Sequence, residues 1–231
     1  MGVLVRCEER PEGGYLAHLT IDNAGKLNSL NRTLMTEIVE TVGGLAGDPR
    51  LRLAVVSGAG ERAFVGGADI AEIAALDHAG ARSFITLVHQ CCNALRRLPV
   101  PVVAQIDGYA LGAGLELACA CDLRVASERS IFGMPEVKIG IPSVVEAALL
   151  PGLIGQGRAR RLLLSGVTIG AGEAEPGIGE RLGIGTQQLG EAAKPFEQIL
   201  GQRLNVAARV AGEEDHLDEL VIGQIVRPSR D

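Results

Sequence analysis

Two glutamates are the residues of this chain with the clearest potential for acid–base chemistry. Glu116 lies in a run of Leu, Ala and Cys, where an ionised carboxylate is costly unless it has a partner or a task. Glu136 follows Pro135 in a loop. Its carboxylate can be interpreted equally well as part of a simple turn or as a functional group. Two carboxyl groups can act as acid and base if burial raises the pKa of at least one of them.

Two glycine-rich turns offer a second kind of chemistry. They contain Gly66-Gly67 and Gly112-Ala113-Gly114, and each leads into a predicted helix. A strand that turns through glycines into a helix leaves backbone N–H groups unpaired at the helix start, which favours an oxyanion there. Together the two turns could place two N–H donors on one oxygen atom, although an ordinary tight turn would explain each of them alone.

Hydrophobic patterns predict the elements that position these residues. The β-branched run at residues 100–106 predicts a buried strand before the second turn, and residues 115–121 predict the helix that carries Glu116. Further strands are predicted at 3–6, 15–21, 53–56, 122–126 and 130–133, and further helices at 31–45, 69–76, 81–98, 143–154, 158–164 and 191–210. The first two strands form a hairpin, and the alternation that follows predicts an α/β fold with mostly parallel strands.

Composition excludes several classes of protein. The 231 residues are 47% hydrophobic and 22% charged, with a net charge of −6 and scattered basic residues, which argues against a nucleic-acid surface. No apolar run is long enough to span a membrane, and the N-terminus lacks the apolar core of a signal peptide. We therefore expect a cytoplasmic protein without membrane or nucleic-acid partners.

Metal and redox chemistry find little support in the sequence. The five cysteines and four histidines show no metal-ligand spacing, so no metal site is predicted, and the cysteines are interpreted as small buried residues in a reducing compartment. The serine-hydrolase elbow, the phosphate loop of nucleotide hydrolases and the dinucleotide-binding glycine motif are also absent from the sequence.

Four segments resemble the crotonase superfamily, which includes enoyl-CoA hydratases and isomerases. They are residues 63–70 (AFVGGADI), 107–117 (DGYALGAGLEL) followed by Cys-Asp, and 135–141 (PEVKIGI), with 26–30 (KLNSL) similar to the early CoA-binding segment of the family. The motifs occur in the family's order over about residues 1–166. Each would be weak alone, but together they are specific.

The resemblance implies a fold and an assembly. The expected fold is the crotonase-like spiral of repeated ββα units, with a core domain at residues 1–166, and the expected assembly is a homotrimer or a dimer of trimers. Residues 167–231 depart from the family's pattern because they are glycine-rich and end early. The family's C-terminal helices close the site and build the trimer. The departure therefore affects both the expected closure of the site and the expected trimer.

The resemblance also implies an acyl-CoA substrate whose thioester oxygen sits between the backbone N–H groups of Ala68 and Ala113. Glu116 and Glu136 match the two acids that activate water and handle the proton at Cα in the hydratases. The implied reaction, in fatty acid metabolism, is hydration of a 2-enoyl-CoA to a 3-hydroxyacyl-CoA, with coenzyme A entering only as part of the substrate and no separate cofactor.

By the same resemblance the CoA moiety is bound by Lys26, Leu27, Ala68, Asp69, Ile70 and Gly112. Asp69 has a second interpretation of equal weight, because it can cap the helix that follows it. Glu146 is a third carboxylate near the site in sequence, and we expect it on the surface of a helix start, where acids are favoured.

Two alternatives to hydration stay open. One is another crotonase reaction, such as isomerisation of the enoyl double bond with one dominant acid. The other is a catalytically silent acyl-CoA-binding scaffold, which the aberrant C-terminal region would permit. Turnover with an enoyl-CoA ester separates these alternatives.

Overall fold

The structure, a computed structural model, describes residues 1–11, 13–143, 145–174 and 180–181. Contacts divide the chain into two units, Met1–Gly183 and Ile184–Asp231, and every described residue belongs to the first. The predicted domain boundary between residues 166 and 167 stays a prediction, and the helix expected at 191–210 lies outside the described residues.

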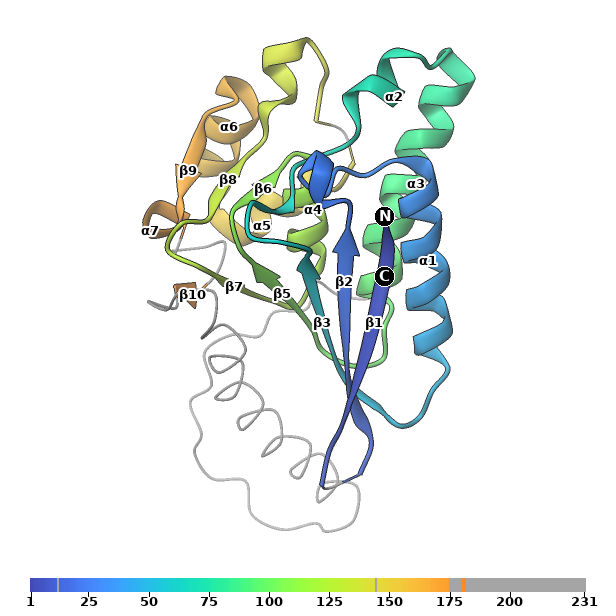
Figure 1. Cartoon of the computed structure of the whole chain (residues 1–231). Helices are drawn as coiled ribbons and strands as arrows, with labels where there is room; N and C mark the ends of the chain where they lie inside the picture. The colour runs from blue at the N-terminus through green and yellow to red at the C-terminus, as the bar shows by residue number, and fades with distance from the viewer. Residues whose placement is uncertain (12, 144, 175–179, 182–231) are drawn as a thin grey trace. The chain divides into compact units, whose positions relative to one another are not determined.

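The larger sheet begins with the predicted hairpin and continues with parallel strands (Figure 1). Its strands, in spatial order, are β1 (Gly2–Glu9), β2 (Tyr15–Asp22), β3 (Leu51–Gly58), β5 (Val102–Ile106), β7 (Leu123–Ala126) and β10 (Glu180–Arg181). Only the β1–β2 pair is antiparallel in this sheet. The expected α/β class with mostly parallel pairing is confirmed.

A second sheet is built from strands of three residues each. Its order is β4 (Ala63–Val65), β6 (Tyr109–Leu111), β8 (Ile131–Gly133) and β9 (Thr168–Gly170), of which only β9 runs antiparallel to its neighbour. The sequence analysis predicted no strand at β4 or β6, immediately before the two glycine turns, and this was wrong. Three residues are too few to show the alternation by which a strand is recognised.

Successive strand pairs supply one strand to each sheet and then lead into a helical element. β3 and β4 precede α2 (Ile70–Ala74) and α3 (His78–Arg96), and β5 and β6 precede α4 (Ala113–Ala120). β7 and β8 precede η2 (Pro135–Ile139), a 3-10 turn. This repetition is the predicted spiral of ββα units.

The remaining helical elements flank this repeat. They are η1 (Ala24–Lys26), α1 (Arg32–Ala46), η3 (Glu146–Leu149), α5 (Leu150–Ile154), α6 (Gln156–Ser165) and α7 (Ala171–Ala174). Asn31 caps α1 as predicted, its side chain accepting a hydrogen bond from the N–H of Leu34 at 2.8 Å. The single helix predicted at 143–154 is wrong: the chain forms η3 and then α5, where Pro151 sits in the first turn, a position that favours a new helix start.

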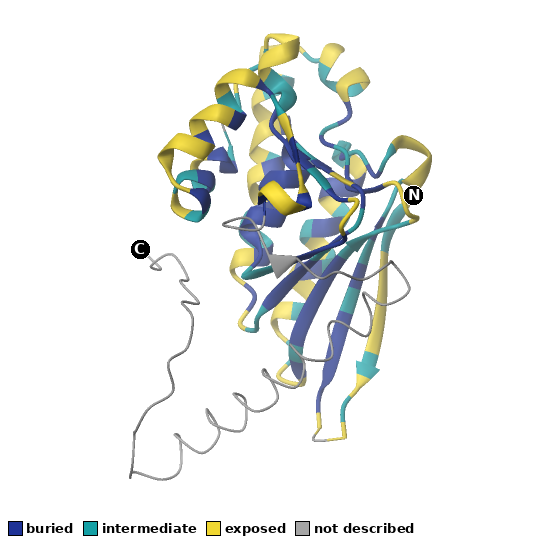
Figure 2. Cartoon of the chain, turned by 90° about the vertical axis from the view of Figure 1, so that its left-hand side faces the viewer, coloured by how far each residue is buried: buried dark blue, intermediate teal, exposed yellow. Residues whose placement is uncertain are grey.

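The core joins the helices to both sheets, and its buried residues are dark blue in Figure 2. α1 and α3 run side by side (Figure 1) and share a core cluster with the buried faces of β2, β3 and β5. Every residue of α4 is buried, so this short helix is fixed on all sides. Among the described helices, none combines the length and apolar character that crossing a bilayer requires.

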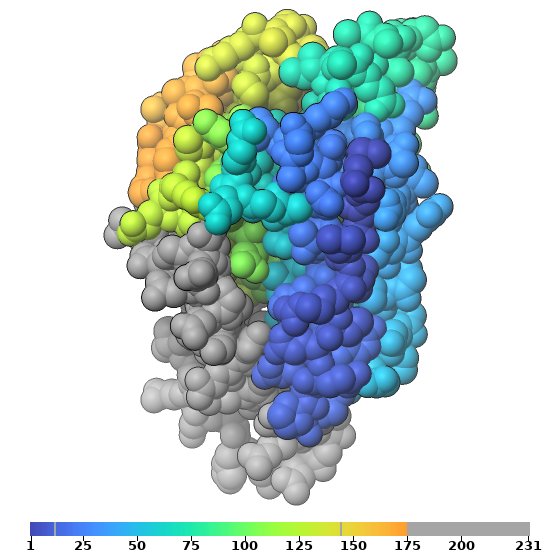
Figure 3. Space-filling view, in the orientation of Figure 1, coloured from blue at the N-terminus to red at the C-terminus, as the bar shows by residue number. Residues whose placement is uncertain are grey.

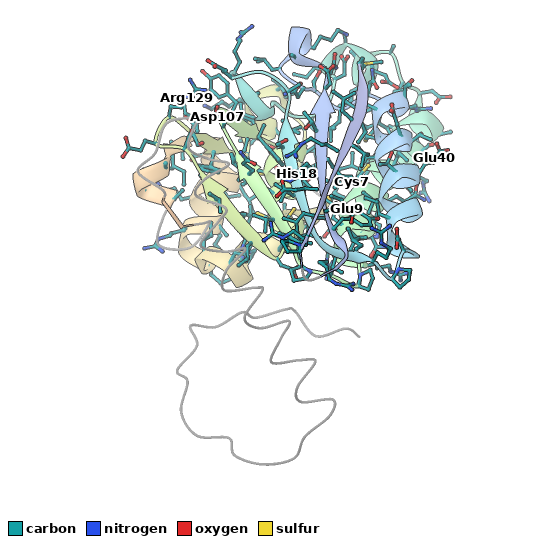
Figure 4. The ribbon with its side chains drawn as sticks, turned by 60° about the horizontal axis from the view of Figure 1, so that its bottom comes forward. Cys7, Glu9, His18, Glu40, Asp107 and Arg129 are labelled. Carbon is teal, nitrogen blue, oxygen red and sulfur yellow. The ribbon has the colours of Figure 1, made fainter. Side chains whose placement is uncertain are left out.

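The carboxyl end of β5 is tied to the turn between β7 and β8. Asp107 accepts hydrogen bonds from Ser127 Oγ and from Arg129 Nε, both at 2.7 Å, and the guanidinium of Arg129 pairs with both carboxylate oxygens. Asp107 and Arg129 lie side by side in Figure 4. This contact fixes the point from which the chain enters β6 and the second glycine turn.

Candidate active site

The two glycine turns lie side by side because β4 and β6 are neighbouring parallel strands. Gly67 has φ +118°, and a Cβ atom placed on it would lie 3.3 Å from the carbonyl oxygen of Leu111. A Cβ on Gly114 would lie 2.1 Å from the carbonyl oxygen of Val65. Glycine is therefore required for the first turn of α4 to approach β4 this closely.

The two predicted N–H donors stand at the ends of these turns. Ala113 is the first residue of α4, whose backbone bonding begins with the Glu116 N–H donating to the Gly112 carbonyl at 3.0 Å. Ala68 precedes the cap of α2. Within the described part of the chain, the backbone N–H groups of Ala68 and Ala113 have no hydrogen-bond acceptor, as the oxyanion hypothesis requires.

Glu116 is a buried carboxyl group on α4, with 5% of its surface exposed. Its Oε1 accepts a hydrogen bond from the backbone N–H of Ala147 at 2.8 Å. Burial raises the pKa of Glu116 to about 7, and the nearby charges of Glu136 and Glu146 add to this effect. At neutral pH this carboxyl group is therefore populated in both protonation states, which is the condition for efficient proton transfer.

Glu136, a residue of η2, lies against the start of α4, the helix that carries Glu116. A Cβ on Gly112 would lie 2.3 Å from Glu136 Oε1, so the carboxylate rests against the backbone where α4 begins. Its Oε2 accepts a hydrogen bond from Ser143 Oγ at 3.0 Å. The structure thus brings Glu116, Glu136 and the Ala113 N–H together, although 20 residues of sequence separate the two acids.

Ser143 and Glu146 differ from what the sequence analysis expected. Ser143 does not cap a helix but donates to Glu136. Glu146 is not on the surface: it is 6% exposed and pairs with His89. The sequence did contain a signal for its burial, because Glu146 lies within an apolar run, as Glu116 does.

The residues assigned to CoA binding gather around η1 and the start of α2. Lys26 Nζ lies 2.8 Å from Asp69 Oδ2, and Asp69 Oδ1 also accepts from the N–H groups of Ala71 and Glu72. Asp69 therefore caps α2, one of its two expected roles, and its role in binding stays a prediction. The Lys26 side chain is 62% exposed, so it is accessible to an anionic ligand.

The other predicted binding residues are neighbours of this ion pair. Leu27 accepts a hydrogen bond from the Gly66 N–H at 2.8 Å, which joins η1 to the first glycine turn. Ile70 exposes 59% of its surface. In Figure 3 η1 and the segment that follows β3 lie together on one face of the molecule. Lys26 and Ile70 are exposed there, whereas Asp69 is buried.

A small cavity, open to solvent, lies elsewhere, lined by residues of α5, α6, β9 and α7. None of the residues predicted to act in catalysis or CoA binding lines it. The candidate site is therefore defined by the carboxyl groups and N–H donors rather than by this cavity.

Comparisons with known proteins show to which family the chain is similar. A model of the enoyl-CoA hydratase/isomerase family matches residues 12–216. The chain is 35% identical over 210 residues to the crotonyl-CoA hydratase of Syntrophomonas wolfei, covering 88% of this chain and 81% of that one. It is 37% identical over 162 residues to the short-chain-enoyl-CoA hydratase of Clostridium acetobutylicum, covering 70% of this chain but only 62% of that one, less than two thirds.

The fold has similar solved relatives. The crystal structure of the Bacillus anthracis enoyl-CoA hydratase superimposes with a TM-score of 0.78 and 30% identity, covering 85% of this chain and 76% of that one. Fold and sequence together define a protein of the crotonase superfamily. The chain belongs to the enoyl-CoA hydratase/isomerase family of enzymes.

Proposed function

We propose that this enzyme adds water to a 2-enoyl-CoA thioester and yields a 3-hydroxyacyl-CoA. The observation that carries the proposal is the meeting of two carboxyl groups, Glu116 and Glu136, beside the unpaired N–H of Ala113. The names of the relatives, crotonyl-CoA hydratase and short-chain-enoyl-CoA hydratase, support the same reaction.

The reaction needs negative charge to be stabilised on the thioester oxygen. When the oxygen of water bonds to Cβ, electrons of the conjugated double bond move toward the carbonyl and produce an enolate-like oxygen. In the proposed mechanism the N–H groups of Ala68 and Ala113 donate to this oxygen. Losing one such donor costs about 3 kcal/mol of transition-state stabilisation.

The two glutamates account for the protons. One carboxylate takes a proton from the attacking water, and the other carboxyl group delivers a proton to Cα, so a hydroxyl group and a hydrogen are added with no change of total charge. The raised pKa of Glu116, about 7, fits a group that must exchange a proton in every turnover. The proposed step consumes no electrons, so we expect no redox cofactor or metal.

The CoA moiety would enter over η1. Lys26, Leu27, Asp69 and Ile70 lie beside Ala68, and the cationic Nζ of Lys26 suits a phosphate of the nucleotide. Gly112 would contact the acyl thioester through its backbone, because no side chain fits between it and Glu136.

The experiment is turnover of crotonyl-CoA, followed by loss of the conjugated enoyl absorbance. Glu116→Gln and Glu136→Gln keep the side-chain shape. Each variant should lose most of the hydration activity but still bind the CoA ester. Asp48→Asn is the matched control, since this carboxylate accepts from Tyr15 Oη at 2.9 Å near the amino end of β3.

The alternatives are outcomes of the same experiment. Activity in either Gln variant equal to that of the parent would show that the glutamate is not catalytic. Binding of the ester without loss of absorbance would favour a silent scaffold, and migration of the double bond in a 3-enoyl-CoA would favour an isomerase.

We further propose that the chain assembles as a homotrimer or a dimer of trimers in the cytoplasm. Three large apolar side chains at the η2–α6 contact support assembly, because Val137, Ile139 and Leu164 are 43%, 53% and 75% exposed. Apolar side chains that gather on a surface are typical of protein–protein interfaces.

A further inference from the structure

Glu146 is a buried charge that the proposed reaction does not use. Only 7% of its side chain is exposed, and two side chains of α3 face it, with His89 Nδ1 at 2.5 Å from Oε1 and Arg96 Nη1 at 3.8 Å from Oε2. A carboxylate can only accept a hydrogen bond, so the His89 Nδ1 carries the proton. A buried carboxylate paired in this way is costly to disrupt.

The residue after Glu146 supplies the hydrogen bond to Glu116. The Ala147 N–H donates to Glu116 Oε1 at 2.8 Å, and both Ala147 and Glu116 are buried. η3 is therefore attached on two sides: its Glu146 side chain holds α3, and its backbone N–H holds the carboxyl group on α4. α4 also packs against both α3 and η3.

We propose that His89 and Glu146 form a positioning pair that holds η3 so that the Ala147 N–H stays on the carboxyl group of Glu116. The proposal rests on the proposed function, in which Glu116 is a proton-transfer group. His89 and Glu146 do not touch the reacting atoms in it; they act through Glu116.

The pair also adjusts the charge around Glu116. The negative charge of Glu146 contributes to the raised pKa of Glu116, and so does that of Glu136. The titratable or charged groups described around Glu146 are His89, Arg96 and Cys92 on α3 and Glu116 on α4. Arg96 opposes the effect of Glu146, because a cation beside a carboxylate cancels part of its field.

The two variants should therefore differ in their effect on the pKa of Glu116. The Ala147 N–H bonds the carboxylate and lowers the pKa of Glu116, so His89→Ala, which frees η3, should raise this pKa. Glu146→Gln frees η3 as well but also removes a negative charge, which lowers the pKa, so its rise should be smaller. A contact that only stabilised the fold would leave the pKa of Glu116 unchanged in His89→Ala.

The first measurement is the pH dependence of kcat and KM for enoyl-CoA hydration. Glu146→Gln and His89→Ala should each lower kcat about tenfold or more, because a misplaced catalytic group is expensive, while KM changes little. His89→Asn keeps a side-chain N–H near the position of Nδ1 and should restore most of the loss. Asp48→Asn is again the control and should match the parent.

A second measurement does not depend on turnover. Titration of the glutamate carboxyl carbons by NMR, with Glu116→Gln to assign the signal, gives the pKa of Glu116 directly. If the parent protein shows no hydration, the proposed function fails, but a raised pKa of Glu116 in His89→Ala would still support the positioning pair.

The double variant His89→Ala/Glu146→Gln completes the test. Residues that act as a unit are non-additive, so the double variant should lose no more kcat than Glu146→Gln alone. Independent, additive losses would overturn the proposal. So would an unchanged pKa of Glu116 and an unchanged kcat in His89→Ala.

Discussion

Glu116 is costly to the fold at high pH because a carboxyl group on a fully buried helix must then ionise. Its pKa is about 7 in the folded protein and near the ordinary 4.5 when unfolded. Between these values the folded state binds more protons than the unfolded state, so the free energy of unfolding falls as the pH rises. The loss reaches about 3 kcal/mol above pH 7.

Glu116→Gln should therefore stabilise the protein at high pH. The amide has no proton to lose and escapes the penalty, so the Tm difference between the variant and the parent should become more positive from pH 5 to pH 8. Thermal unfolding of both proteins at the two pH values measures it. An equal Tm difference between variant and parent at both pH values would contradict the raised pKa of Glu116.

Gly112 is the residue on which the position of Glu136 depends. Its φ of +51° is unfavourable for other residues, and a Cβ would lie 2.3 Å from Glu136 Oε1. Gly112→Ala should displace the carboxylate and lower kcat about tenfold or more. Gly152→Ala is the control, because a Cβ there meets no atom within 4 Å. An unchanged kcat in Gly112→Ala would show that Glu136 does not need this position.

At the scale of elements, η1 and α2 form one side of the proposed CoA site through the Lys26–Asp69 pair. Lys26→Ala should raise KM more than it lowers kcat, because it removes binding remote from the reacting bond. Arg50→Ala, which removes another exposed cation that pairs with a carboxylate, Glu9, should leave both constants unchanged. An equal loss of kcat in Lys26→Ala would argue against a binding role.

At the scale of the whole molecule, burial decides which thiols can react. Cys91, Cys92, Cys119 and Cys121 are buried, whereas Cys7 is exposed on β1, where Figure 4 labels it. Burial raises the pKa of Cys91, Cys119 and Cys121 to about 12, and reaction requires the thiolate. A thiol reagent should therefore modify one of the five cysteines in the folded protein and all five in denaturant. Rapid labelling of more than one would indicate that the core opens.

A second prediction for the whole molecule concerns its assembly into a trimer. Leu164→Glu places a charge in the exposed apolar surface that also contains Val137 and Ile139. If this surface forms the expected trimer, light scattering should show a smaller assembly for the variant. Ile85→Glu, at an exposed apolar position on α3, is the control. A parent protein that is already monomeric would refute the trimer.

The sequence by itself determined the class of fold, the hairpin, the cap of α1 and the candidate residues of the site. These features are local: a β-branched run, a helical stripe, an Asn before a helix and short glycine motifs carry their own physical signal. The resemblance to the crotonase superfamily came from such local motifs and is confirmed by the family match and the solved relatives.

Tertiary structure alone decided how these residues meet. β4 and β6 are too short to be recognised locally, and they form because each finds a neighbour in the second sheet. Glu146 lies inside because α3 presents His89 and Arg96 to it, an arrangement that no spacing along the chain encodes. The raised pKa of Glu116 has the same origin, since burial and long-range neighbours set the cost of its charge.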